Sequence, residues 1–302
     1  MLVIASRGSQ LALWQARWVS AQLTQLGHEC RIEIIKTTGD KITDVPLAKV
    51  GTKGLFTKEI EEALLAGTID IAVHSLKDMP TDIPAGLTLA AIPEREDPRD
   101  AFVGRALASL PHGARVGTGS LRRAAQLRAL RPDLKIEDIR GNVDTRLRKL
   151  DEGQYDSIVL ASAGLRRLGW DYRITEMFDP GIMCPAVGQG ALAVETRDDG
   201  GPGFQAAKRL EHVATRAAVT AERAVLASLG GGCQAPMGAH AYIDGDKLFI
   251  LALIVSPDGV QVVRKEMQGS VSDAAALGHA LGEELLGAGG RQILEAVYGT
   301  QA

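Results

Sequence analysis

Aromatic residues are scarce in this 302-residue chain: phenylalanine, tryptophan and tyrosine together make up 4% of it. Proteins that bind single-stranded nucleic acid stack its bases on exposed aromatic rings, so this scarcity argues against that class. The formal net charge of −3 also gives the molecule no overall attraction to nucleic acid. The composition therefore favours a protein that acts on small molecules.

Membrane-length apolar runs, paired cysteines and metal-ligand spacings are also missing. No apolar stretch approaches the length of a membrane span, and the chain begins directly with a strand-like segment. The cysteines, Cys30, Cys184 and Cys233, are odd in number and far apart, which indicates a reducing compartment. The scattered histidines predict no metal site. We therefore expect a cytoplasmic protein without metal, nucleic-acid or membrane partners. A monomer is predicted as well, although none of these features determines the oligomeric state.

Short strands rich in β-branched residues alternate with amphipathic helices over the first two thirds of the chain. This pattern is typical of α/β lobes with mainly parallel sheets. The same succession of elements is predicted twice. A strand, a Gly-Ser turn and a helix occur at 2–27 and again at 115–130. Two sequence echoes support the doubling. They are Gly8-Ser9 with Gly119-Ser120, and Leu64-x-x-Gly67-x-x-Asp70 with Leu150-x-x-Gly153-x-x-Asp156.

Proline-containing segments near 93–98 and 180–185 are the places where we expect the chain to pass from one lobe to the other. Two such passages predict a hinged cleft between the lobes. The last part of the chain reads as an antiparallel three-stranded meander covered by two helices. The predicted fold class is therefore α/β, with two lobes around a cleft and a C-terminal α+β domain. The expected domains are residues 1–94 with 191–212, residues 95–190, and residues 213–302, the last carrying Cys233.

Polar and basic residues gather at the turns that follow the predicted strands, where open α/β sheets bind ligands. Serines at helix N-termini and arginine forks both suit carboxylates or phosphates, so the turns predict a small polyanionic ligand. Taken singly, the serines fit ordinary N-caps and the arginine pairs fit solvated helix faces. The residues are Arg7, Ser9, Lys49, Lys53, Lys77, Asp78, Thr118, Ser120, Arg122, Arg123, Arg140 and Arg146.

Two residues in this pattern suggest chemistry beyond binding. Cys233 lies in the glycine-rich turn at 230–238, where a thiol can point into a cleft and be alkylated. A small buried cysteine beside a helix end is the alternative. Asp78 follows an apolar strand and adjoins Lys77, so its carboxylate can stabilise a developing cation or move protons. A surface pair of Asp78 and Lys77 is the alternative there.

The chain resembles the porphobilinogen deaminase, or hydroxymethylbilane synthase, family through eight runs in one collinear order. They are SRGSQLALWQA (6–16), PLAKVGTKGLFTKEIE (46–61), DIAVHSLKDMP (70–80), EREDPRDAFV (94–103), GTGSLRRAAQL (117–127), IRGNVDTRLRKLD (139–151), PAVGQGAL (185–192) and GGCQAPMGAHA (231–241). The resemblance implies two lobes like those of type 2 periplasmic binding proteins. It implies a transferase of tetrapyrrole and haem biosynthesis, which condenses four porphobilinogen molecules head to tail, with loss of ammonia, into linear hydroxymethylbilane.

The same resemblance implies a dipyrromethane cofactor joined by a thioether to Cys233, and it assigns roles by position. Asp78 would stabilise the cationic azafulvene and the pyrrole N–H groups. Cofactor contacts would fall on Cys233, Lys77, Asp78, Thr118, Ser120, Arg122 and Arg123; substrate contacts on Arg7, Ser9, Gln15, Arg140, Arg146 and Arg167; the lid on Lys49 and Lys53. One departure is Gly119, where the family commonly has serine, so one hydroxyl contact to a carboxylate is absent.

Two other function classes explain parts of the pattern. A two-lobed anion-binding protein without catalysis accounts for the hinge, the serines and the arginines. It leaves the turn around Cys233 and the third domain unexplained, and it predicts no covalent adduct. A cysteine-dependent hydrolase needs a base near Cys233, and the nearest histidine in sequence, His240, has no evident orienting partner.

Overall fold

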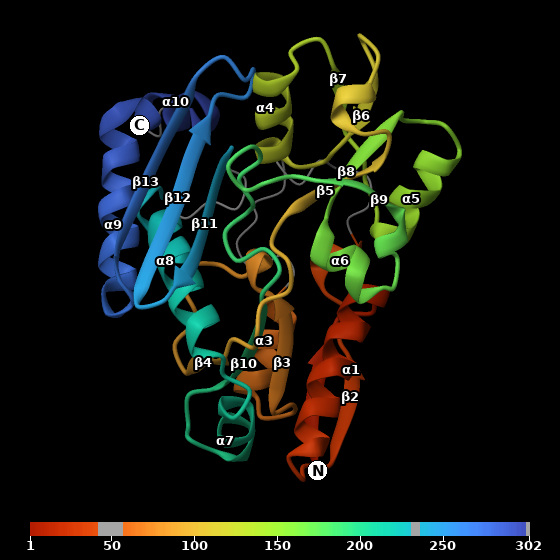
Figure 1. The fold of residues 1–302 in the computed structure, drawn as a ribbon. Coiled ribbons are helices and arrows are strands. Elements are labelled where there is room, and N and C mark those ends of the chain that lie inside the picture. The colour runs from red at the N-terminus through yellow and green to blue at the C-terminus, as the bar shows by residue number, and fades with distance from the viewer. Residues whose placement is uncertain (42–56, 231–235, 300–302) are drawn as a thin grey trace. The chain divides into compact units, whose positions relative to one another are not determined.

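The computed structural model describes residues 1–41, 57–230 and 236–299 (Figure 1). The chain divides into two compact units, which are described separately below. The first contains residues 1–96 and 190–216, and the second contains residues 97–189 and the chain from 217 onward. None of the helices in the described part of the chain has the length and apolarity to span a bilayer.

The first unit is built on a five-stranded sheet in the order β2-β1-β3-β10-β4. Buried side chains of α1 and α7 pack on one face of this sheet, and those of α3 pack on the other. The strands are β1 (Leu2–Ser6), β2 (Cys30–Ile34), β3 (Ile71–Ser75), β4 (Leu87–Ala91) and β10 (Leu192–Arg197). The helices are α1 (Gln10–Gln25), α2 (Thr38–Lys41), α3 (Lys58–Leu65), the 3₁₀ helix η2 (Leu76–Asp78) and α7 (Pro202–Lys208).

The second unit contains a five-stranded sheet of equivalent order, β7-β6-β8-β5-β9. Its strands are β5 (Asp100–Gly104), β6 (Arg115–Gly117), β7 (Lys135–Glu137), β8 (Ser157–Ala161) and β9 (Ile174–Met177). Its helices are η3 (Leu107–Ser109), α4 (Leu121–Leu130), α5 (Val143–Asp151), α6 (Ser162–Arg167) and η4 (Asp171–Arg173).

The two sheets repeat one plan, as the sequence echoes predict. In the first sheet, Asp70 Oδ2 accepts a hydrogen bond from the Val3 N–H at 2.9 Å. In the second, Asp156 Oδ2 accepts one from the Arg115 N–H at 2.8 Å. The glycine of each echo has a positive φ, +70° and +74°, and ends the preceding helix. The same short motif therefore anchors β1 in the first sheet and β6 in the second, the strands that lead into the serine-capped helices.

The prediction of mainly parallel sheets is wrong, because half of the strand pairings in each sheet are antiparallel. β10 runs antiparallel to β3 and β4, and β5 runs antiparallel to β8 and β9. A parallel connection needs a long crossover, usually a helix, between two strands of one sheet. β5 and β10 instead follow directly where the chain passes from one unit to the other, so they enter their sheets without such a crossover.

The predicted C-terminal meander is confirmed as an antiparallel sheet in the order β11-β12-β13. Helices α8 and α9 share one apolar core with this sheet, and Figure 1 shows α9 running along it. The strands are β11 (Met237–Asp244), β12 (Lys247–Val255) and β13 (Val262–Ser270). The helices are α8 (Val213–Ser228), η5 (Val271–Asp273), α9 (Ala274–Leu285), the π-helical turn η6 (Leu286–Gly290) and α10 (Arg291–Tyr298).

Helices α8 and α9 approach so closely that Gly278 of α9 has no room for a side chain. A Cβ at Gly278 would lie 2.1 Å from the Ala221 carbonyl oxygen. Gly278→Ala is therefore expected to lower the free energy of unfolding by about 1–3 kcal/mol, as overpacking does. Urea unfolding would measure the change. The control is Gly287→Ala, where no atom lies within 4 Å of the added carbon; an equal loss there would contradict the prediction.

Candidate functional site

The predicted residues of the first unit lie where β1 and β3 end, and these strands are neighbours in the sheet. Ser9 follows β1 and caps α1, with its Oγ accepting a hydrogen bond from the Ala12 N–H at 3.3 Å. Gln15, one turn further along α1, is buried, and its Nε2 donates to Ser75 Oγ at 2.9 Å. This bond ties the start of α1 to the end of β3. Arg7 lies in the turn between β1 and Ser9.

Lys77 and Asp78 lie in η2, directly after β3. Lys77 is half-buried, whereas the side chain of Asp78 is exposed. The backbone around them is fixed at both ends, because the Leu76 N–H donates to the Ala191 carbonyl at 3.0 Å and Met79 is buried. A short helical turn on a buried strand therefore presents the Asp78 carboxylate to solvent at the same sheet edge as Ser9.

In the second unit, Thr118 and Ser120 form the equivalent turn between β6 and α4. The buried Thr118 accepts a hydrogen bond at Oγ1 from the Ser120 N–H at 3.2 Å. Ser120 caps α4, and its Oγ accepts from the Arg123 N–H at 3.5 Å. The remaining predicted residues follow the neighbouring strands: Arg140 follows β7 and Arg167 ends α6 after β8. Because β6 and β7 run parallel, Thr118, Ser120 and Arg140 follow strands that end on one side of the sheet, and Arg167 lies one helix beyond β8.

Arg122 and Arg123 are buried and share one carboxylate, that of Asp100 at the start of β5. Arg122 Nη1 lies 2.6 Å from Asp100 Oδ2, and Arg123 donates from both Nε and Nη2 to Asp100 Oδ1, at 3.0 and 2.8 Å. Burial disfavours the charged carboxylate, but the two guanidinium groups outweigh it and hold the pKa of Asp100 well below its usual range. The three charges form one buried ion group beneath the N-terminus of α4.

Asp100→Asn is expected to lower the free energy of unfolding by about 3–5 kcal/mol, because it leaves two buried guanidinium charges without an anion. The depressed pKa means that the ion group stabilises the fold above the pKa of an unfolded aspartate and loses that effect in acid. The difference between the two proteins, measured by urea unfolding, should therefore shrink below about pH 4. Asp246→Asn, at an exposed residue of the turn between β11 and β12, should change little at any pH; an equal change would contradict the prediction.

Helix α4 also holds the segment that leads from β9 to β10. Gln126 accepts a hydrogen bond from the Cys184 N–H at 2.7 Å and donates to the Cys184 carbonyl at 3.1 Å. Gln189 Nε2 donates to Asp100 Oδ1 at 2.8 Å. The fully buried Glu222 of α8 then accepts from the N–H groups of Gly188 and Ala241, at 2.7 and 2.8 Å. These bonds connect the ion group to α8 and β11.

A second group of cations surrounds the turn after β7. Arg146 Nε donates to the Gly141 carbonyl at 2.8 Å, and Arg140 Nε lies 3.3 Å from Asp138 Oδ2. Burial lowers the pKa of Arg146 to about 10, the positive charges of Arg123 and Arg140 contribute, and Asp138 opposes them. The guanidinium of Arg146 thus stands in a net positive field, which an added anion would relieve.

The residues of the second unit fit a group that carries several carboxylates. Hydroxyls at the N-terminus of α4, its free N–H groups and the guanidinium groups around β7 are all donors suited to carboxylate oxygens. No group of histidine, cysteine and acidic side chains suited to a metal ion occurs in the described parts of the chain. The donor set therefore favours an organic polyanion.

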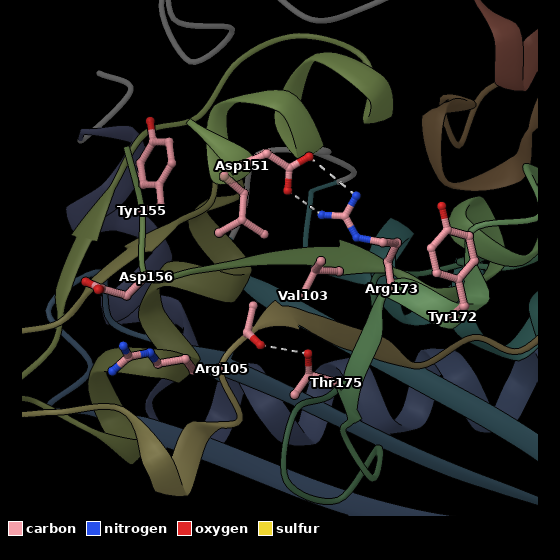
Figure 2. A pocket seen from close by; sticks show the side chains of 10 residues that line it. Val103, Arg105, Asp151, Tyr155, Asp156, Tyr172, Arg173 and Thr175 are labelled. Carbon is pink, nitrogen blue, oxygen red and sulfur yellow. Dashed lines mark hydrogen bonds and ion pairs between the residues drawn. The ribbon is translucent and has the colours of Figure 1, made fainter. Parts of the chain in front are cut away.

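A separate open pocket of about 440 Å³ lies at the opposite end of the second sheet (Figure 2). The ends of β5 and α5 and the starts of β8 and β9 line it. An ion pair of Asp151 and Arg173, 2.6 Å apart, forms part of its wall, and Tyr155, Tyr172 and Arg105 complete it (Figure 2). None of the predicted site residues lines this pocket, so it is not part of the predicted site.

Three predicted residues, Cys233, Lys49 and Lys53, lie outside the described residues. Conversely, four buried polar side chains that organise the second unit carry no predicted role: Asp100, Gln126, Gln189 and Glu222. Asp100, Gln126 and Gln189 lie within the runs shared with the family. No spacing or charge pattern marks them, because their partners are far away in the sequence.

Two family profiles match the chain. "Porphobilinogen deaminase, dipyromethane cofactor binding domain" covers residues 2–201, and "Porphobilinogen deaminase, C-terminal domain" covers residues 216–287. A porphobilinogen deaminase from Roseiflexus castenholzii is 55% identical over 298 residues, 97% of this chain and 98% of that protein. One from Syntrophobacter fumaroxidans is 51% identical over 300 residues, 98% of this chain and 97% of that protein.

Among solved structures, similarity is found to a periplasmic substrate-binding protein of an ABC transporter from Coxiella burnetii. It is 14% identical, with a TM-score of 0.43, and the match covers 70% of this chain and 91% of that chain. A nutrient-binding protein from Burkholderia cenocepacia, bound to methionine, is 12% identical with a TM-score of 0.43. That match covers 68% of this chain and 90% of the other.

Proposed function

Because the chain belongs to the porphobilinogen deaminase family and is therefore a hydroxymethylbilane synthase, we propose the following mechanism for its own residues. The enzyme joins four porphobilinogen molecules head to tail and releases one ammonia for each, which yields linear hydroxymethylbilane. Cys233 would hold a dipyrromethane cofactor through a thioether. When bound, that cofactor supplies the pyrrole carbon to which the first substrate is joined.

The observation that carries this proposal is the grouping of carboxylate-binding donors at the carboxyl ends of β6, β7 and β8. Each porphobilinogen unit brings an acetate and a propionate, so the growing chain is increasingly anionic. Thr118, Ser120 and the N-terminus of α4 would hold cofactor carboxylates, together with Lys77 of the first unit. Arg140 and Arg146 would hold carboxylates of the incoming substrate or the growing chain, and Arg146 stands in a net positive field.

Arg122 and Arg123 would contribute to cofactor binding differently from two exposed arginines that bind a carboxylate directly. Each already binds Asp100, yet two cations and one buried carboxylate leave a net positive charge below the N-terminus of α4. A cofactor carboxylate at that N-terminus would experience both this charge and the helix dipole. We therefore assign these two arginines to cofactor binding through the field of the ion group as well as through direct contact.

Substrate contacts in the first unit would come from Arg7, Ser9 and Gln15, and Arg167 would add one in the second. Ser9 leaves free N–H groups at the start of α1, which favour an anion as the start of α4 does. The Asp78 carboxylate would stabilise the positive charge that develops as porphobilinogen loses ammonia, and would accept hydrogen bonds from pyrrole N–H groups. Lys49 and Lys53 would contribute to a lid.

The test is incubation of the purified protein with porphobilinogen while ammonia and tetrapyrrole are both measured. The expected result is four ammonia molecules for each linear tetrapyrrole, which closes in acid and oxidises to a porphyrin with a strong visible absorption. A non-catalytic anion-binding protein would bind porphobilinogen and release no ammonia. The three-domain division, the cytoplasmic location and the monomeric state stay predictions from the sequence.

A further inference from the structure

In the second unit, the loop after β6 contacts the loop after β7 at a glycine. Gly119 lies in the loop after β6 and Asp138 in the loop after β7, and these strands pair in parallel. A Cβ at Gly119 would lie 2.9 Å from Asp138 Oδ1 and 3.0 Å from the Ile139 carbonyl oxygen. Gly119 has no positive φ in this structure, so its backbone alone does not require glycine. The carboxylate of Asp138 therefore occupies the space beside Gly119.

Asp138 is held in this place from two sides. The Tyr155 hydroxyl donates a hydrogen bond to the Asp138 carbonyl at 2.9 Å, which fixes the backbone. Its Oδ2 lies 3.3 Å from Arg140 Nε, and its negative charge also reaches Arg146. The Asp138 side chain remains 55% exposed, so it can exchange its place for solvent. The carboxylate of Asp138 thus already lies beside the guanidinium groups of Arg140 and Arg146.

We propose that Asp138 sets the affinity of the site for substrate: its carboxylate takes the place of a ligand carboxylate at Arg140 and uses the space that Gly119 leaves open. The inference rests on the proposed function, in which Arg140 and Arg146 bind carboxylates of the substrate or growing chain. It assigns to Gly119 a role that the missing serine hydroxyl alone does not explain: glycine admits the internal anion.

An internal anion changes how the site handles successive substrates. A substrate carboxylate must displace Asp138 from Arg140, so binding exchanges one ion pair for another and gains less than binding to a bare guanidinium. When the ligand leaves, Asp138 returns and again neutralises the cation. The site therefore binds each carboxylate more weakly and releases it more readily, which suits a chain that must move on after every addition.

The charge of Asp138 is tested by Asp138→Asn, which preserves its shape. In the holoenzyme, the KM for porphobilinogen should fall about three- to fivefold, the range of an exposed ion pair, with kcat within about twofold. The control is Asp144→Asn, which makes the same change of net charge on an exposed residue of the first turn of α5. An unchanged KM in Asp138→Asn, or an equal fall in Asp144→Asn, would overturn the proposal.

The space beside Gly119 is tested by a double-mutant cycle. Gly119→Ala, which adds the Cβ without a new hydroxyl, should push Asp138 away from Arg140 and lower KM, whereas the same change in an Asp138→Ala background should have little further effect on KM. Additive effects of Gly119→Ala and Asp138→Ala would contradict the coupling. Circular dichroism and urea unfolding of each variant would separate a local change from misfolding.

A binding measurement keeps this proposal separate from the proposed function. Citrate serves as a tricarboxylate probe, and its affinity for the wild-type protein and Asp138→Asn is measured by calorimetry at fixed ionic strength. Tighter citrate binding by the variant would support the role of Asp138 even if the wild-type protein released no ammonia from porphobilinogen. Equal citrate affinities would contradict that role even if turnover were normal.

Discussion

Asp78→Ala is expected to fold normally and to lose turnover by a factor of about 10²–10⁴, the range for removal of a group that stabilises charge or transfers a proton. The side chain is exposed at the end of η2 and makes no hydrogen bond or ion pair with any described residue. Its removal should therefore cost the fold little. The measurements are kcat from porphyrin absorption and the urea midpoint of unfolding.

The matched control for this variant is Glu62→Ala, which removes an exposed carboxylate from α3 of the same unit. It should keep both stability and kcat. Asp78→Asn keeps the size of the side chain and should lose turnover as alanine does, because the negative charge is what the developing cation needs. Full activity of Asp78→Ala would remove this carboxylate from the mechanism.

Cys233→Ser is expected to lose the covalently attached group entirely. The intact mass of the denatured wild-type protein should exceed the chain mass by two deaminated porphobilinogen units, and the variant should show the bare chain mass. A serine hydroxyl is a far weaker nucleophile than a thiolate, so it should not replace the thioether. A protein purified without the group should first be incubated with porphobilinogen, because an apoprotein would otherwise give the same mass.

The other cysteines provide the control for this measurement. Cys184 is fully buried, and burial raises the pKa of its thiol to about 12, so it stays protonated and inert. Cys30 is half-buried on β2, and Cys30→Ser should keep the added mass and the activity. An added mass that survives in Cys233→Ser but disappears in Cys30→Ser would move the attachment site. No added mass in any protein would favour the non-catalytic anion-binding alternative.

The doubled architecture could be predicted because its signals are local. A serine that caps a helix, and an aspartate three residues after a helix-ending glycine, form their bonds within one strand–helix unit of each lobe. Strands β4, β5, β9 and β10 were not predicted. Their neighbours in the sheets lie far away in the sequence: Val194 of β10 pairs with Val73 of β3, and Asp100 of β5 pairs with Ala161 of β8. Pairing between such distant segments produces no local sequence pattern from which the strands could be predicted.

The candidate site shows the same division between local and distant causes. The positions of Ser9 and Ser120 at helix starts follow from their turns and are confirmed. The turn at 118–120 placed Arg122 and Arg123 at the start of a helix but could not show that Asp100 would bind both. That partner is buried on a strand that the sequence did not reveal. Predicting a charged residue's place is thus easier than predicting which charge it meets.

The position of β10 has a consequence for the order in which the protein is completed during synthesis. β10 lies between β3 and β4, so β4 has no neighbour in its sheet until residues 192–197 have been made. The second sheet needs only residues 100–177, which are continuous in the chain. On the ribosome, the lobe that begins first therefore closes last, and its unpaired strands must wait while the whole second sheet emerges.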